Sequence, residues 1–184
     1  MISRLFLLLT SLMALSACSG TSAGEYQQQV GRLSSQAAIL EEELSAIDSA
    51  EAVRLYETSG SVLEQFRTIA GRDTLELEFA RKLESYVTAN KDLEHLPSEL
   101  VNCKTALAAA EIRLAELKKD IRQGNGERTK YATWVTAESA EMKAIGNHCS
   151  DLKRRFSASE SAIAQFQPEI ERYISRFVQP VKVP

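Results

Sequence analysis

Apolar residues recur at alternating steps of three and four along most of this chain, and this spacing constrains its fold more than any other feature. The longest series runs from Tyr131 to Phe177, and only Glu138 and Ser159 interrupt its apolar character. Alternating steps place the side chains in one stripe along a helix, as at the seam of a coiled coil. No segment keeps a period of two, so the sequence predicts no β-sheet.

Two further series show the same spacing. One comprises Tyr26, Val30, Leu33, Ala37, Leu40, Leu44 and Ile47, and the other comprises Leu100, Cys103, Leu107, Ala110, Leu114, Leu117 and Ile121. A low aromatic content of 7% also favours long helices over a sheet. The sequence therefore predicts an all-α fold: an elongated, antiparallel three-helix bundle with helices at about 25–70, 74–123 and 127–178. At 1.5 Å per residue this rod would be about 70–75 Å long.

Turn residues separate the predicted helices. Gly71-Arg72-Asp73 predicts the first turn, after which Asp73 and Glu76 have the spacing of a capping box that starts the second helix. Gly124-Asn125-Gly126 predicts the second turn, because glycine and asparagine tolerate the left-handed backbone that ends a helix.

Some positions weaken the prediction of unbroken helices. Ser59-Gly60-Ser61 could break the first helix, and Pro97 should make the second helix kink or restart near Ser98, because proline has no backbone N–H to donate. Gly146 could interrupt the third helix, although the apolar stripe continues through it. The prolines of residues 179–184 predict an extended tail.

The N-terminal residues have the pattern of a secretory signal. A short positive start precedes an apolar run from Leu5 to Leu15, which is far below the ~20 residues of a membrane span. Leu15-Ser16-Ala17-Cys18 resembles the lipobox of bacterial lipoproteins. That resemblance implies removal of residues 1–17, attachment of lipid to Cys18 and, with Ser19 following, the periplasmic face of an outer membrane. A plain secretory signal is the alternative.

The lipobox resemblance divides the chain into four parts. After the signal peptide, residues 18–24 comprise the lipidated cysteine and a small, polar stretch that we interpret as a flexible tether. Residues 25–178 form the helical domain, and residues 179–184 form the tail. The predicted partners are the membrane, through the lipid, and an envelope protein.

Cys103 and Cys149 are predicted to form a disulfide. They lie 22 residues before and 24 residues after Asn125, and both belong to the apolar series. In a helical hairpin that turns at Asn125, residues equally far from the turn face each other. Two facing cysteines in an oxidising compartment should be joined. Two buried free thiols are the alternative.

The sequence indicates neither an enzyme nor a metal or cofactor site. His148 and Cys149 are neighbours that diverge on a helix, and His95 has no second ligand motif. Glu41-Glu42-Glu43 reads as a solvated helix face. The formal net charge of −3 and the lack of a strong basic patch argue against nucleic acid as a partner.

Topology predicts which end of the rod is close to the membrane. The first helix leaves the lipid and the second returns, so the turn at Gly124–Gly126 should be membrane-proximal. Arg128, Lys130, Tyr131 and Trp134 follow this turn and could rest on lipid head groups. Packing of Tyr131 and Trp134 inside the bundle is the alternative.

These features favour a lipid-anchored periplasmic scaffold, spacer or adaptor of the cell envelope. A pilotin-like or chaperone lipoprotein that grips an outer-membrane or secretion-system client is the second hypothesis, favoured if an apolar groove lies near Gly60 or Pro97. An envelope enzyme is the third. A monomeric bundle is favoured, although heptad stripes can also pair between chains in a coiled-coil homo-oligomer.

Overall fold

The computed structural model describes residues 22–69 and 75–178. The predicted signal peptide, Cys18, the turn at Gly71–Asp73 and the tail all lie outside the described residues. Four α-helices and one short 3-10 helix account for the described chain: α2 (Ala23–Ser45), α3 (Ser49–Ile69), α4 (Leu77–Gln123), η2 (Arg128–Lys130) and α5 (Tyr131–Val178). No strand occurs within these ranges, so the predicted all-α bundle is confirmed.

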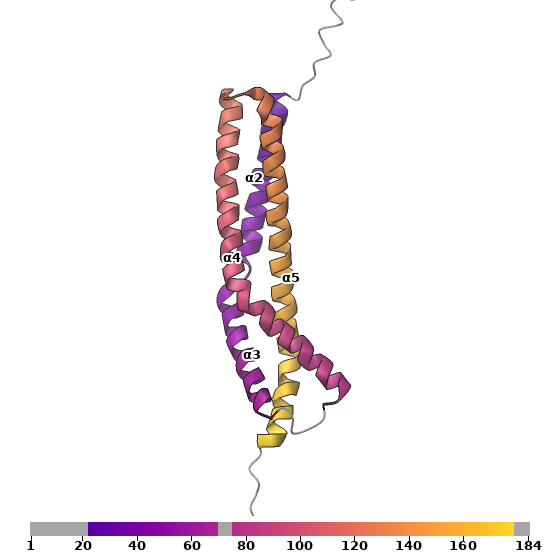
Figure 1. Cartoon of the computed structure of the whole chain (residues 1–184). Helices are drawn as coiled ribbons and strands as arrows, with labels where there is room; N and C mark the ends of the chain where they lie inside the picture. Colours follow the sequence, from indigo (N-terminus) through magenta and orange to yellow (C-terminus); the bar gives the residue numbers. More distant parts are fainter. Residues whose placement is uncertain (1–21, 70–74, 179–184) are drawn as a thin grey trace, which may run out of the picture.

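The bundle is a long rod built on the α4–α5 hairpin, with α2 and α3 following one another along it (Figure 1). The rings of Tyr26 and Tyr131 meet edge to face at one end, and those of Phe66 and Tyr173 meet at the other. The first two helices therefore run parallel to α5 and antiparallel to α4. This is the predicted up-down-up order, with the first helix in two pieces.

The prediction of one continuous first helix is wrong, because the chain breaks at Ala46–Asp48. The side chain of Asp48 accepts hydrogen bonds from the backbone N–H groups of Ala50 and Glu51 at 2.9 and 3.1 Å, and so caps α3. Ile47 is nevertheless 5% exposed, so the apolar stripe crosses the break without interruption. Ser59-Gly60-Ser61, which the sequence left open as a second place for a break, does not interrupt α3.

The start of the first helix also differs from the prediction. Ser22 and Glu25 form a capping box, in which each side chain accepts from the backbone N–H of the other residue. The helix therefore begins at Ala23, inside the stretch interpreted as a flexible tether. The predicted capping box of the second helix is wrong as well: α4 begins at Leu77, and Glu76 occupies its N-cap position without a side-chain hydrogen bond.

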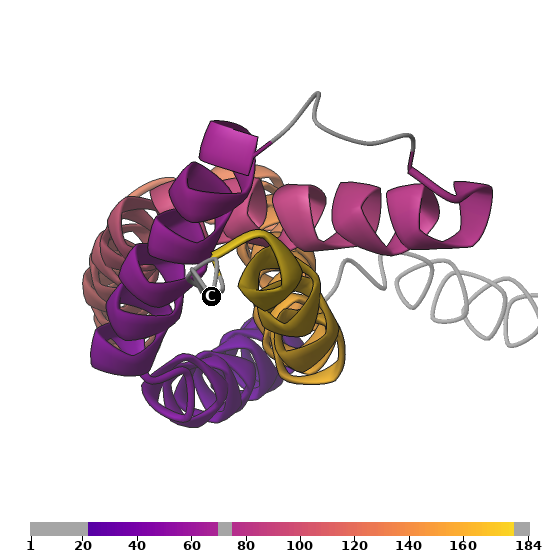
Figure 2. The same ribbon diagram turned by 90° about the horizontal axis from the view of Figure 1, so that it is seen from below.

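Pro97 bends α4 without ending it. The helix is continuous from Leu77 to Gln123, so the predicted kink is present and the predicted restart is not. The half before the proline crosses α5 obliquely, and the half after it runs along the rod (Figure 1). Seen from below, the first half of α4 reaches outward past α5 (Figure 2). Pro168 lies inside α5, and Gly146 does not interrupt that helix.

The turn between α4 and α5 has the predicted left-handed glycines. Gly124 has φ 68° and Gly126 has φ 78°, values that suit a residue without a Cβ. Asn125 donates its backbone N–H to the carbonyl of Asp120 at 2.9 Å. The Tyr131 hydroxyl donates to the carbonyl of Asn125 at 2.5 Å and so closes the loop from the α5 side.

Candidate functional site

The structure brings Cys103 of α4 and Cys149 of α5 together at the centre of the hairpin. Their Sγ atoms are 3.2 Å apart, each residue is 2% exposed, and both are thiols here. Burial raises the pKa of the Cys149 thiol to about 12, and the contact with Cys103 acts in the same direction. The predicted juxtaposition is present, but the predicted bond between the two sulfurs is not formed.

Ion pairs across the hairpin keep the same register as the cysteines. Arg113 of α4 pairs with Glu138 and Glu141 of α5 at 3.0 and 2.6 Å. Its hydrogen bond with Glu138 is the main cause that raises the pKa of Arg113. Glu138 is the charged residue that interrupts the longest apolar stripe, and the ion pair with Arg113 offsets its negative charge. These ion pairs therefore help to hold α4 and α5 together along their apolar contact.

The register also persists beyond the bend in α4. Lys82 contacts both carboxylate oxygens of Glu169 at 3.1 Å, and the Tyr86 hydroxyl donates to the side-chain carbonyl of Gln167 at 3.1 Å. Arg155 pairs with Glu99 near Pro97. Partners on the two helices thus remain about equally far from the turn along their whole contact.

Three of the four residues expected near the membrane are exposed, and the fourth is buried. Arg128 and Lys130 are exposed, and Lys130 pairs with Glu127 at 3.0 Å. Trp134 is 38% exposed, and its ring covers Gly126. Tyr131 is only 1% exposed, so it packs inside the bundle, as the alternative interpretation has it. Arg128, Lys130 and Trp134 are the members of this set that solvent or a head group can reach.

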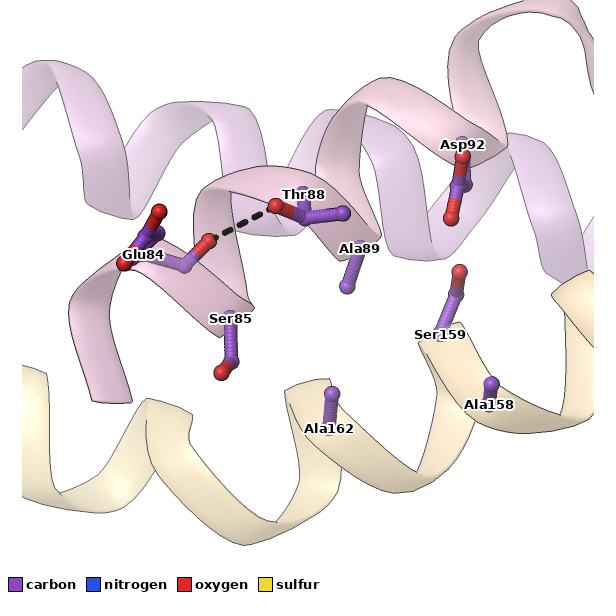
Figure 3. A pocket seen from close by; sticks show the side chains of 8 residues that line it. All are labelled: Glu84, Ser85, Thr88, Ala89, Asp92, Ala158, Ser159 and Ala162. Atoms are coloured by element: carbon purple, nitrogen blue, oxygen red, sulfur yellow. Dashed lines mark hydrogen bonds between the residues drawn. The ribbon is translucent and has the colours of Figure 1, made fainter. Parts of the chain in front are cut away.

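A hollow of about 340 Å³ lies where the bent half of α4 crosses α5 (Figure 3). It is open to solvent, and its lining comprises Glu84, Ser85, Thr88, Ala89, Asp92, Ala158, Ser159 and Ala162. The Ser159 hydroxyl points into this space from α5, opposite the carboxylate of Asp92 (Figure 3). Five of its eight lining residues are polar and the other three are alanines, so this hollow offers no large apolar side chain to a client helix.

The two buried serines on the two sides of α4 differ in their hydrogen bonds. Ser59 and Ser159 are the two buried polar residues of the described core, at 0% and 2% exposure. Ser59 donates to the carbonyl of Leu55 at 2.6 Å and accepts from Asn90 at 2.8 Å. Within residues 22–69 and 75–178, no hydrogen bond joins Ser159 to another side chain or carbonyl. The sequence marked Ser159 as a gap in the stripe but could not show which space it faces.

The described residues supply no group of three or more His, Cys, Asp or Glu side chains that could hold a metal ion. The two histidines, His95 and His148, are exposed, and neither lines the hollow. None of the described helices has a stretch both long and apolar enough to span a bilayer. Comparisons with protein-family models, with curated proteins and with solved structures found no match to this chain.

The two buried serines give a matched pair of substitutions. Ser59→Ala should lower the free energy of unfolding by about 1 kcal/mol, because it removes one of the two hydrogen bonds that the Asn90 amide donates to α3 and leaves only the bond to the Tyr56 carbonyl. Ser159→Ala should change the free energy of unfolding by less than about 0.5 kcal/mol, because its hydroxyl has no protein partner among the described residues and faces a hollow that is open to solvent. Urea denaturation followed by circular dichroism measures both. Equal losses in the two variants would contradict this assignment.

Proposed function

We propose that this chain is a lipid-anchored helical rod of the bacterial envelope that acts as a scaffold or adaptor by binding another envelope protein. One observation carries the proposal. The first described helix begins at Ala23, five residues after the candidate lipidation site Cys18, and it starts at the same end of the rod as the Gly124–Gly126 turn (Figure 1). A lipid on Cys18 would therefore hold one defined end of a stiff body at the membrane.

The short distance between Cys18 and the helix supports an oriented attachment. Four peptide units separate Cys18 from the N-cap residue Ser22, and a fully extended chain of this length spans about 14 Å. Arg128, Lys130 and Trp134 at the turn would then lie within reach of the head groups, where basic and aromatic side chains are favoured. The opposite end of α5 would stand about 70 Å away at 1.5 Å per residue.

In this proposal Cys103 and Cys149 are joined by a disulfide in the envelope. A protein disulfide would be the oxidant: one thiolate attacks it to form a mixed disulfide, the second thiolate displaces the carrier, and the carrier leaves as a dithiol. The reaction needs thiolates, and burial raises the pKa of Cys149 to about 12 in the folded bundle. Oxidation should therefore occur before the hairpin closes.

Protein isolated from envelopes under non-reducing conditions should yield a Cys103–Cys149 cross-linked peptide by mass spectrometry. Reduction of this bond should lower the free energy of unfolding by about 4 kcal/mol, because the bridge closes a loop of about 45 residues. A Cys103→Ala/Cys149→Ala chain is the control and should show no effect of reductant. Two free thiols in freshly isolated protein would refute the disulfide.

Trp134 is the single tryptophan of the chain and reports on the orientation of the rod. In vesicles with dansyl-labelled head groups, the lipidated protein should show energy transfer from Trp134 to dansyl. A Trp134→Phe/Phe177→Trp chain carries the donor at the far end and should show little transfer. Equal transfer from both positions would mean that the rod lies flat on the membrane and would exclude a rod that stands on it.

The adaptor role is tested by cross-linking the native lipoprotein in envelopes and identifying what is captured with it. A stoichiometric envelope protein that is lost with the Cys18→Ala chain would support an anchored adaptor. Capture of an outer-membrane or secretion-system client by both forms would instead favour the pilotin-like alternative. Identical behaviour of the two forms with no captured protein would contradict the adaptor role.

A further inference from the structure

The half of α4 that follows Pro97 carries a second apolar stripe, which faces away from the bundle. It comprises Val101, Thr105, Ala108, Ile112 and Ala115, which step 4-3-4-3 along the helix and are all exposed. Val101 and Ile112 are each 62% exposed and lie on the same face of the helix, so their apolar surface is continuous with that of the residues between them. The Thr105 hydroxyl donates to the carbonyl of Val101 at 2.9 Å, so its methyl group is free to pack. We call these five residues the outer stripe.

The inner seam of the same helix is already filled within the chain. Cys103, Leu107, Ala110 and Leu114 are 0–2% exposed against α2 and α5. Helices α2 and α3 leave the outer stripe uncovered, and a hollow of about 360 Å³ between α2 and α4 borders it. A helix with apolar stripes on two faces can pack with two sets of neighbours at once. Among residues 22–69 and 75–178 no other helix covers the outer stripe, so a second neighbour would come from outside these residues.

Charges at the edges of the outer stripe specify the orientation of that neighbour. Lys104 and Glu111 flank the stripe on the side of the hollow, and Glu116 flanks it on the other side. None of these three side chains takes part in an ion pair of the described residues. Their charges therefore remain available to a partner.

We propose that the outer stripe binds the same stripe of a second copy, with the two α4 helices antiparallel. Thr105 then faces Ala108 of the second copy, and Val101 faces Ile112, so large residues meet at both ends of the contact and small ones at its centre. Lys104 lies beside Glu111 of the second copy, and the two-fold symmetry makes this pair twice. The stripe is thus complementary to itself in both shape and charge.

A parallel dimer on the same stripe is disfavoured. In a parallel pair Lys104 would lie beside Ala109 of the second copy and gain nothing, whereas Glu111 would lie beside Glu116 and be repelled. Charge therefore selects the antiparallel arrangement over the parallel one.

The bend at Pro97 limits the contact to the straight half of α4. Residues 98–115 extend for about 27 Å at 1.5 Å per residue, which is enough for a modest interface rich in alanine. Because the symmetry axis passes between residues 106 and 107, the two Gly124–Gly126 turns would lie about 55 Å apart at opposite ends of the overlap. In this dimer the two candidate lipidation sites would lie at opposite ends, so only one of the two chains could have its Gly124–Gly126 turn at a given membrane. The dimer is therefore tested with the unanchored Cys18→Ala chain, in which its formation does not depend on the proposed function.

Sedimentation of the full Cys18→Ala chain tests the dimer directly. The mass should rise from one chain towards two over the micromolar range, as expected for a small interface. Ile112→Glu should abolish the rise. Ile39→Glu is the matched control, because Ile39 is 59% exposed on α2 and lies outside the outer stripe. A monomer at every concentration, or a dimer that Ile112→Glu leaves intact, would overturn the proposal.

Charge exchange tests the orientation. Lys104→Glu and Glu111→Lys should each weaken the dimer about tenfold, because each replaces two attractive pairs by two repulsive ones. The double variant should restore the original affinity. In a parallel dimer Glu111→Lys would strengthen association instead, so that outcome would refute the antiparallel arrangement. Unchanged helical circular dichroism in each variant shows that folding is intact.

Discussion

The fold depends on the seam between α4 and α5. Arg113 and Glu138 near the turn, the cysteine pair at the centre, and Lys82 with Glu169 beyond the bend all face one another at nearly equal distances from that turn. A slip of one residue would rotate these side chains by about 100° on their helix and break all three contacts. The left-handed glycines of the turn fix this register, and α2 and α3 pack on the hairpin that results.

The sequence predicted most of the helical architecture because burial follows its apolar spacing. Every member of the series from Leu100 to Ile121 is buried, and the longest series stays at the seam from Tyr131 to Ile170. The break between α2 and α3 was missed for the same reason. Ile47 continues the apolar spacing, so periodicity does not reveal that the backbone there is no longer helical. The spacing of Asp48 and Glu51 resembles a helix start and was the available signal.

The structural effects of single residues were less predictable from the sequence, because they depend on contacts with residues that are distant in the sequence. Gly60 did not break α3: Asn90 of α4 bonds both the hydroxyl of Ser59 and the carbonyl of Tyr56, and so holds α3 against α4. The facing of Cys103 and Cys149 was predictable because it needs only a hairpin and a turn. The hollow beside Ser159 was not, because it depends on the angle at which Pro97 directs α4 across α5.

The outer stripe on α4 shows why periodicity alone gives an incomplete account of such a rod. Val101 and Ile112 belong to a series with the same steps as the inner one, displaced around the helix, and only the packed structure tells which of the two is covered. Since the inner seam is satisfied within the chain, its heptads cannot also drive assembly between chains without unfolding the bundle. Any association through helices must use a face that the monomer leaves open. The outer stripe on α4 meets that condition. In an antiparallel pair, Lys104 and Glu111 at its edge lie beside Glu111 and Lys104 of the second copy, so the same two residues supply both ion pairs.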